Sequence, residues 1–514
     1  MNRRILATIA SLSVAVSALV AAPATAAPVS TAPAQEGVAA TAETAASRLS
    51  WGPCSNRPRR VECATLAVPR DWANPSAGPR YSISVARIRA AGPVRLGVLT
   101  FNPGGPGAPG VGMITRVHKQ LPRLVRSSFD LVAWDPRGVG SSQPNLRTCP
   151  AAEMPDLPAV GPVDWKAYTA GVFDATAEQN AGCLAVNKVD SQYIGTWQVI
   201  RDLDALRAAL GEQQITFWGM SYGSTVGRAY AQQFPQRLRT LVLDGTISPT
   251  PSILSYSREH IWDDGQAVET MVGALGRSSV RTYNRVIRSL ERRPLEIGDG
   301  GLLTRWEFVL TLTSAVAYQQ LWPAVKEFLA IVRQAQRAGQ PDATTASRIS
   351  DMLEEFERSF PVTWRAGESD PGYTFINCAD MHDRPTATQL AAVVEQGAGV
   401  AGTAYGLKAL FEGVQCAGLP TLGTELPDLI VPLLLPTPPV IINSVSDNRT
   451  PWYGARMTAN VFTRSSMVSY AGTQHVTYAG PSTCVDIPVT RYLLTQELPP
   501  ASVACPLEYQ PPPR

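Results

Sequence analysis

The segment around Ser221 constrains the fold of this chain more than any other feature. The apolar run Ile215–Trp218 leads into Gly219–Gly223 (sequence GMSYG), and a helical pattern follows over Ser224–Phe234. A G-x-S-x-G pentapeptide between a strand and a helix is typical of a sharp turn that exposes the serine hydroxyl at the edge of a sheet. The following helix points its N-terminus at that hydroxyl, which favours developing negative charge. Ser221 is therefore a candidate nucleophile.

Strand and helix patterns alternate on both sides of this turn. An apolar i, i+3, i+4 stripe predicts a helix over Thr196–Leu210, and short apolar or β-branched runs predict strands. The further expected strands are Tyr81–Ile88, Gly97–Phe101, Phe129–Trp134, Leu241–Leu243, Val440–Asn443 and Met467–Tyr470. This alternation indicates an α/β fold in which helices cover both faces of a mostly parallel sheet.

The pattern changes near Pro249, because the segment from Ile253 to about Glu425 is mostly helical. Within it, Trp322-Pro323 predicts a helix start and Gly339 a helix end. A helical block between two parts of one sheet indicates an inserted cap. The expected organisation is a signal peptide at 1–26, a disordered leader at 27–47, a core in two parts at 48–250 and 426–514, and a helical cap at 251–425.

The first residues carry an export pattern. Arg3 and Arg4 precede the apolar run Ile5–Ala22, and Ala24–Ala26 (ATA) fits the small-x-small rule for signal cleavage. The longest later apolar run, Leu429–Ile442, is interrupted by prolines and is shorter than the ~20 residues that span a bilayer. We expect a secreted, extracellular protein with no membrane contact after signal cleavage.

The eight cysteines predict four disulfides in an exported chain. The sequence permits many connectivities, and we expect neighbours to pair, as Cys54–Cys63, Cys149–Cys183, Cys378–Cys416 and Cys484–Cys505. Zinc binding is the alternative, but the sequence lacks a C-x-x-C pair or a Cys/His cluster. We expect neither a metal nor a cofactor. The formal net charge of +3 is too balanced for a nucleic-acid-binding protein.

A serine hydroxyl needs a base to become a nucleophile. In folds with this turn the order along the chain is serine, acid, histidine. This order excludes His118, and His260 and His382 fall within the helical block, so His475, just after strand Met467–Tyr470, is the candidate base.

Asp447 is the candidate acid, because it follows strand Val440–Asn443 and precedes the histidine. Such an acid orients the imidazole and stabilises its cation. The rivals are less well placed, since Asp428 precedes the strand and Asp486 follows the histidine.

The loop Asn102–Gly107 (NPGGPG) follows strand Gly97–Phe101. A glycine-rich loop lets backbone amides approach an anion closely. We expect an oxyanion hole formed by the N–H groups of Gly105 and Tyr222.

Taken together, several motifs resemble the secreted tripeptidyl aminopeptidase-like branch of the α/β-hydrolases, with prolyl iminopeptidases as broader relatives. They are Asn102–Gly107, Trp134–Ser142 (WDPRGVGSS), Gly219–Gly223, Leu243–Gly245 (LDG) and Asp447 with His475. The resemblance covers most of residues 50–510. It implies an α/β-hydrolase fold with a helical cap, and a serine exopeptidase that releases short peptides from free N-termini.

Two positions depart from that family pattern. Pro103 stands where relatives often carry histidine, and Ala417–Leu419 (AGL) follows Cys416 where relatives tend to carry a tryptophan. An aminopeptidase also binds a cationic α-amine, usually through desolvated carboxylates. Asn377–Asp380 (NCAD) resembles a Cys-x-acid element of the family, which makes Asp380 the candidate substrate-binding residue. An exposed or helix-capping aspartate is the alternative.

The same residues fit other functions. An esterase or acyl transferase uses the same machinery, because fold and triad do not fix the substrate. A non-catalytic binding protein on this scaffold is a third alternative. The expected partner is a peptide or a small acyl substrate, and the sequence leaves the oligomeric state open.

Overall fold

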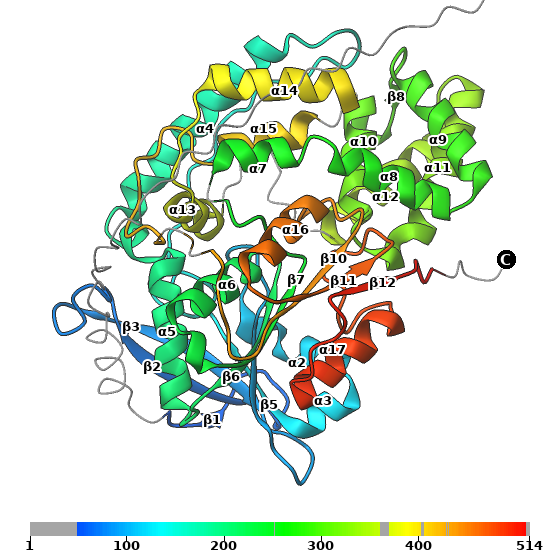
Figure 1. Cartoon of the computed structure of the whole chain (residues 1–514). Helices are drawn as coiled ribbons and strands as arrows, with labels where there is room; N and C mark the ends of the chain where they lie inside the picture. Colours follow the sequence, from blue (N-terminus) through cyan, green and yellow to red (C-terminus); the bar gives the residue numbers. More distant parts are fainter. Residues whose placement is uncertain are drawn as a thin grey trace, which may run out of the picture. The chain divides into compact units, whose positions relative to one another are not determined.

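The computed structural model describes residues 49–250, 252–359, 370–401, 406–427, 429 and 431–509. The expected signal peptide and leader lie outside these residues. A ten-stranded sheet has the order β1-β2-β3-β5-β4-β6-β7-β10-β11-β12 (Figure 1). Its strands are β1 (Gly52–Pro53), β2 (Glu62–Pro69), β3 (Arg80–Ile88), β4 (Gly97–Asn102), β5 (Phe129–Trp134), β6 (Ile215–Met220), β7 (Leu238–Asp244), β10 (Val440–Ser444), β11 (Ser466–Tyr470) and β12 (Ser502–Cys505).

The sheet has an antiparallel edge and a parallel remainder. Strands β1, β2, β3 and β5 pair antiparallel in that order. From β5 to β12 every neighbouring pair is parallel. Strands β5, β6 and β10 are buried at every residue, as expected for parallel strands covered on both faces. The predicted mostly parallel α/β fold is therefore confirmed.

Helices cover the two faces of the sheet. Along β7, Leu241 and Leu243 pack in the hydrophobic cluster that contains α5 and α6, whereas Val242 packs in the cluster that contains α2 and α17. This alternation follows from the two-residue period of a strand. The helices are α2 (Gly110–Gln120), α3 (Arg123–Ser128), α5 (Thr196–Ala209), α6 (Gly223–Gln233), α16 (Trp452–Val461) and α17 (Thr483–Thr495), with the short 3-10 helices η1 (Asp190–Tyr193) and η2 (Pro235–Arg237).

A large helical block lies between β7 and β10 in the sequence (Figure 1). It contains α7 (Ile253–Glu259), α8 (Asp263–Ala274), α9 (Arg277–Leu290), α10 (Arg305–Ala315), α11 (Trp322–Ala338), α12 (Ala343–Ser359), α13 (Pro371–Asp380), α14 (Ala387–Ala401) and α15 (Gly406–Val414), with η3 (Gly298–Gly300), η4 (Gln319–Leu321) and the pair β8 (Leu295–Glu296) and β9 (Leu302–Leu303). The predicted helix start at Trp322-Pro323 is confirmed, and α11 ends at Gly339, whose φ is 90°.

The block has separate hydrophobic clusters. One cluster is formed by the five helices from α8 through α12, and Phe308, Trp322 and Phe328 are fully buried in it. Another joins α14 and α15 to α4 (Trp165–Asn187), a helix that precedes Ser221 in the chain and has no counterpart among the predicted elements. Helix α4 therefore packs with the consecutive helices α14 and α15 although it lies far before them in the sequence (Figure 1).

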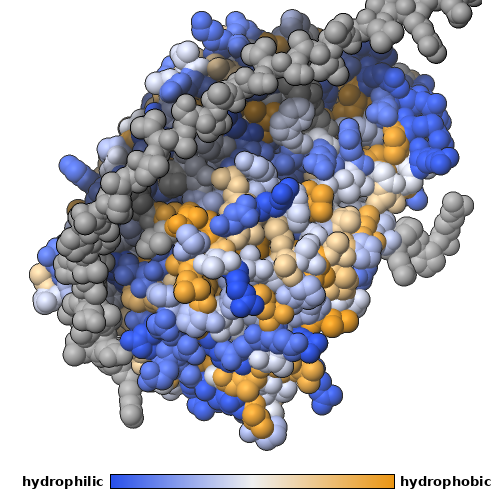
Figure 2. All heavy atoms as spheres, viewed as in Figure 1, coloured by the Kyte–Doolittle hydropathy of each residue, from blue (hydrophilic) through white to orange (hydrophobic). Residues whose placement is uncertain are grey.

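The surface over α9 is strongly hydrophilic. Figure 2 shows hydrophilic side chains gathered at the upper right of the viewed face, where Figure 1 places α9. Helix α9 and the residues just after it carry exposed arginines, namely Arg277, Arg281, Arg285, Arg288, Arg292 and Arg293. Over the described residues, the helices are too short or too polar to cross a bilayer.

All four predicted disulfides are confirmed. Cys54–Cys63, Cys149–Cys183, Cys378–Cys416 and Cys484–Cys505 account for every cysteine of the chain.

Candidate active site

Ser221 lies at a sharp turn between β6 and α6. Its φ of 54° is in the left-handed region, which costs a residue with a side chain about 1–2 kcal/mol. The flanking glycines make the turn possible: a Cβ on Gly219 would lie 2.2 Å from the Gly223 carbonyl oxygen, and one on Gly223 would lie 2.4 Å from the Asn102 carbonyl oxygen. Steric clashes therefore explain why both positions that flank the turn are glycine.

Asp447 and His475 form a buried pair. His475 Nδ1 lies 2.9 Å from Asp447 Oδ2, and the side chains are 12% and 0% exposed. The amides of Arg449 and Thr450 donate to Asp447 Oδ1 at 2.8 and 3.2 Å, and the Thr450 hydroxyl donates to Oδ2 at 3.0 Å. Burial acts to raise the pKa of Asp447, but His475 and the two amides more than offset it, so that the pKa lies below its usual range.

The Ser221 turn and the His475 imidazole both contact the backbone at the end of β7. The Ser221 N–H donates to the Asp244 carbonyl oxygen at 2.8 Å. At the next residue, a Cβ on Gly245 would lie 3.0 Å from His475 Cε1, so the imidazole lies directly against that backbone. The structure thus gathers Ser221, Asp447 and His475 at the carboxyl ends of β6, β10 and β11, where parallel strands of α/β sheets hold their ligands.

Asp244 is a functional candidate that the sequence interpretation missed. Its side chain is fully buried and accepts the N–H groups of Thr477 and Tyr478, both at 2.9 Å, directly after His475. Burial raises the pKa of Asp244 to about 7, although these amides and His475 act to lower it. In the sequence, the motif LDG stands out only through the family resemblance. An acid at the end of the apolar run Leu241–Leu243 is the sequence signal that could have pointed to Asp244.

The helical block also contacts the histidine loop. The His475 N–H donates to the Ala317 carbonyl oxygen at 3.1 Å, and the Thr473 hydroxyl donates to the Val316 carbonyl oxygen at 2.6 Å. The loop that carries the candidate base is therefore fixed from the sheet side by Asp244 and from the block side by the end of α10.

The glycine-rich loop after β4 lies against the Ser221 turn. A Cβ on Gly104 would lie 2.7 Å from Ser221 Cβ and 3.1 Å from the Tyr222 nitrogen. The Gly104 N–H already donates to the Asn102 side chain at 2.9 Å, so Gly105 is the next residue of the loop with an amide. Gly105 and Tyr222 are thus both next to this contact. Their role as oxyanion donors stays a prediction.

Asp380 lies at the C-terminal end of α13 and is buried. Its Oδ1 accepts the Thr196 N–H at 2.9 Å, and its Oδ2 accepts the Thr196 hydroxyl and, at 3.3 Å, the Tyr222 hydroxyl. Burial raises the pKa of Asp380 to about 6. Both carboxylate oxygens therefore have protein partners, and binding of a substrate amine by Asp380 stays a prediction.

Four acidic side chains of α7, α8 and α15, which we call the acidic cluster, lie in the block near Asp447. Its members are Glu259, Asp263, Asp264 and Glu412. Asp264 accepts from Asn448 at 2.7 Å and Glu412 from Tyr373 at 3.3 Å. Burial raises the pKa of Glu259 to about 7 and also raises the pKa values of Asp263 and Glu412. Sequence reasoning missed this cluster because its members come from separate helices.

Several polar atoms in and beside the acidic cluster lack a hydrogen-bond partner among the described residues. They are Glu259 Oε2, Asp263 Oδ2 and Lys408 Nζ. Lys408 is the ammonium that lowers the pKa of both Asp263 and Glu412. The Arg449 guanidinium also lowers the pKa of Glu412, so two cations lie beside the four carboxyl groups of the cluster.

His260, a histidine of the block, has a structural role. His260 Nδ1 lies 2.8 Å from the Tyr256 carbonyl oxygen and Nε2 lies 3.2 Å from the Arg449 carbonyl oxygen. Burial lowers the pKa of His260 to about 3, so it is neutral near pH 7. In the part of the chain that the structure describes, no three His, Cys, Asp or Glu side chains are placed to share a metal ion.

Comparisons with known proteins identify the family of this chain. Residues 97–479 match the family model of the alpha/beta hydrolase fold. Serine protease Hip1 of Mycobacterium tuberculosis H37Rv is 28% identical over 493 residues, which cover 89% of this chain and 91% of that protein. Tripeptidyl aminopeptidase of Streptomyces lividans is 26% identical over 506 residues, which cover 91% and 88%. Carboxylesterase B of M. tuberculosis H37Rv is 28% identical over 493 residues, which cover 90% and 91%. The chain belongs to the α/β-hydrolase family and is a hydrolase.

Proposed function

We propose that this protein is an exported serine aminopeptidase that releases short peptides from free N-termini. The observation that carries the proposal is the buried Asp447–His475 pair, held against the backbone that also holds the Ser221 turn. Relatives named as a serine protease and a tripeptidyl aminopeptidase support a peptidase. Four disulfides, together with the expected signal peptide, support export.

In the first half of the proposed reaction, the Ser221 hydroxyl attacks the carbonyl carbon of the scissile peptide bond. Its proton passes to His475 Nε2, and the new C–O bond leaves a negative charge on the former carbonyl oxygen. The amides of Gly105 and Tyr222 stabilise this charge, and Asp447 stabilises the imidazolium. His475 then gives its proton to the leaving nitrogen, the C–N bond breaks, and an acyl-enzyme remains.

In the second half, a water molecule replaces the departed amine. His475 takes one proton from this water while its oxygen bonds to the acyl carbon. The tetrahedral intermediate collapses, and the Ser221 oxygen leaves and recovers the proton from His475. One water molecule is consumed, and the products are a peptide with a new carboxyl terminus and a peptide with a new amino terminus.

The acidic cluster supports recognition of a free N-terminus. Its four carboxyl groups outnumber the cations Lys408 and Arg449 beside them. The oxygens of Glu259 and Asp263 that have no hydrogen-bond partner among the described residues suit a substrate α-ammonium, which donates three hydrogen bonds. Asp380, the residue expected from the sequence, is the alternative ligand. An N-terminal ammonium bound at a fixed place would limit how many residues precede the cleaved bond.

A direct test compares three substrate classes on the purified protein: peptide anilides with a free N-terminus, the same anilides with an acetylated N-terminus, and short acyl esters. We expect the free anilides to be turned over with the highest kcat/KM. A fluorophosphonate should label the protein, and labelling should vanish in Ser221→Ala. Turnover of esters alone would refute the peptidase proposal, and labelling that persists in Ser221→Ala would refute the nucleophile.

A carboxylesterase is the second candidate function, because carboxylesterase B has the same 28% identity to this chain as Hip1. The ester arm of the same experiment decides between them.

A further inference from the structure

Helix α13 contacts both segments that are predicted to form the oxyanion hole. At its N-terminal end, Asp370 Oδ1 accepts the Gly372 N–H at 2.8 Å and so caps the helix. The other oxygen, Oδ2, lies beside the glycine-rich loop, since a Cβ on Gly107 would come within 3.0 Å of it. A larger side chain at Gly107 would collide with α13, so the loop and the helix lie in direct contact.

At its C-terminal end, α13 contacts the residue that follows the nucleophile. The Tyr222 hydroxyl donates to Asp380 Oδ2 and also contacts the Thr196 hydroxyl, which itself donates to Asp380. Thr196 is the first residue of α5, and its N–H donates to Asp380 Oδ1. The buried Tyr222 side chain is therefore held between the first turn of α5 and the last turn of α13.

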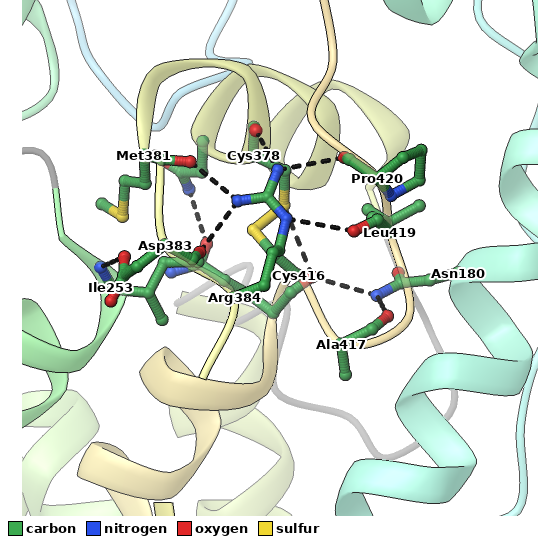
Figure 3. Close-up of a disulfide and its surroundings, with 12 residues drawn as sticks. Asn180, Ile253, Cys378, Met381, Asp383, Arg384, Cys416, Ala417, Leu419 and Pro420 are labelled. Carbon is green, nitrogen blue, oxygen red and sulfur yellow. Dashed lines mark hydrogen bonds between the residues drawn. A yellow bond between two sulfur atoms is a disulfide. The ribbon is translucent and has the colours of Figure 1, made fainter. Parts of the chain in front are cut away.

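The C-terminal end of α13 is firmly anchored (Figure 3). The Cys378–Cys416 disulfide ties α13 to the segment after α15. The Arg384 guanidinium donates to the carbonyl oxygens of Cys378, Met381, Asp383, Leu419 and Pro420. The Asp383 carboxylate accepts the N–H groups of Ile253 and Leu254 at the start of α7. Asp380 thus projects from a helix end that the disulfide and the arginine fix in place.

We propose that Asp380 is a positioning residue, which fixes the Tyr222 side chain and thereby the Tyr222 amide of the oxyanion hole. The inference rests on the proposed catalytic roles of Ser221 and Tyr222. In this inference Asp380 accepts hydrogen bonds from Thr196 and Tyr222 and does not bind the substrate. The acidic cluster binds the substrate α-amine. The helical block would then contribute to transition-state stabilisation as well as to access.

The test variant is Asp380→Asn, which keeps the shape of the side chain but replaces one acceptor oxygen by a donor group. We expect kcat for a free peptide anilide to fall about tenfold, because a displaced oxyanion donor weakens only the transition state. KM and the preference for free over acetylated anilides should stay within about twofold. The rate constant for fluorophosphonate labelling of Ser221 should fall in parallel, since phosphonylation places a similar oxygen in the same hole.

Tyr222→Phe removes only the hydroxyl and should lower kcat and the labelling rate in the same direction, by a smaller factor. It also keeps the inference testable if Asp380→Asn does not fold. Asp383→Asn is the matched control, because Asp383 belongs to the same anchor but does not touch Tyr222. It should lower the melting temperature and leave kcat within about twofold of the wild type.

Three results would overturn the inference. A rise in KM with loss of the preference for free anilides in Asp380→Asn would make Asp380 the amine ligand. Unchanged kcat and labelling in both Asp380→Asn and Tyr222→Phe would remove any positioning role. Equal losses of kcat in Asp380→Asn and Asp383→Asn would show that either substitution loosens the structure around α13, with no specific role for Asp380. If the wild type cleaves no anilide, the proposed function fails, and the labelling rates still decide the role of Asp380.

Discussion

The buried carboxylates of the sheet edge and of the helical block differ in how their charge is balanced. At the sheet edge, Asp447 has His475 and two backbone amides as partners, and its pKa is lowered in spite of burial. In the block, Glu259 has an oxygen with no hydrogen-bond partner in the part of the chain that the structure describes, and burial raises its pKa to about 7. A buried carboxylate whose charge is balanced by hydrogen bonds and a histidine can act in catalysis. A buried carboxylate without such partners is stabilised when it binds a cation. The two regions are therefore suited to different tasks, chemistry and recognition.

The largest expected effect comes from removing the chemistry itself. Ser221→Ala and His475→Ala should each lower kcat by about 10³-fold or more, because the remaining interactions cannot replace the attack by serine. Both variants should keep the wild-type melting temperature within a few degrees, since neither side chain anchors the core. Anilide turnover and thermal unfolding measure the two properties. Substantial residual turnover in either variant would contradict the assignment of the sheet edge to catalysis.

Asp447→Asn should lower kcat by about 10³- to 10⁴-fold with a small change in KM, because the imidazole loses both its orientation and the charge that stabilises its cation. Steady-state kinetics on a free peptide anilide check this expectation. A rise in KM at unchanged kcat would place Asp447 in recognition and would break the contrast between the two regions.

Glu412→Gln should show the opposite pattern. Loss of one negative charge from the acidic cluster should raise KM for free anilides about tenfold and leave the acetylated anilides unaffected. Glu269→Gln is the matched control, because Glu269 lies on α8 but is exposed. If both variants change KM equally, the effect is one of overall charge, and the cluster has no special role in recognition.

Asp244 sharpens the comparison, because it lies at the sheet edge and yet its pKa is raised to about 7. The unfolded chain binds this proton only near pH 4, so the group contributes stability below about pH 4 that is lost as the pH rises through about 7. We therefore expect the free energy of unfolding of the wild type, relative to Asp244→Asn, to decrease between about pH 4 and pH 7, by at most about 1.4 kcal/mol per pH unit.

Denaturant unfolding at several pH values measures this difference. Above about pH 8 the difference should be constant, since Asp244 is then ionised in both states. A difference that does not change between pH 4 and pH 8 would show that the Asp244 carboxyl titrates normally, and that its amide partners balance its charge as fully as those of Asp447 do.

Residues that follow predicted strands could be found from the sequence. The strand Phe129–Trp134 was predicted with its observed bounds, and Ser221, Asp447 and His475 each follow a predicted strand. The spacing of apolar residues and the glycines of the turn are local signals, and they were sufficient to locate these side chains at one sheet edge.

Contacts between the helical block and the rest of the chain could not be predicted in this way. Asp380 and Thr196 are 184 residues apart in the chain, and Asn448 and Asp264 are also 184 apart. Helix α4 escaped prediction because polar side chains such as Thr169, Gln179 and Asn180 lie on its buried face. No local pattern specifies such pairings, since they depend on how the helices pack.

The connectivity of the disulfides has a consequence for the integrity of the enzyme. Each bridge joins cysteines no more than 38 residues apart, and none ties the portion that carries Ser221 to the portion that carries Asp447 and His475. A single proteolytic cut between α11 and α12 would leave two fragments held together by non-covalent contacts alone, among them the β7–β10 ladder and the hydrogen bond from the His475 N–H to the Ala317 carbonyl oxygen. Once separated in denaturant, these fragments would have to find each other again in a concentration-dependent reaction, so the nicked protein should regain activity more slowly on dilution than the intact chain.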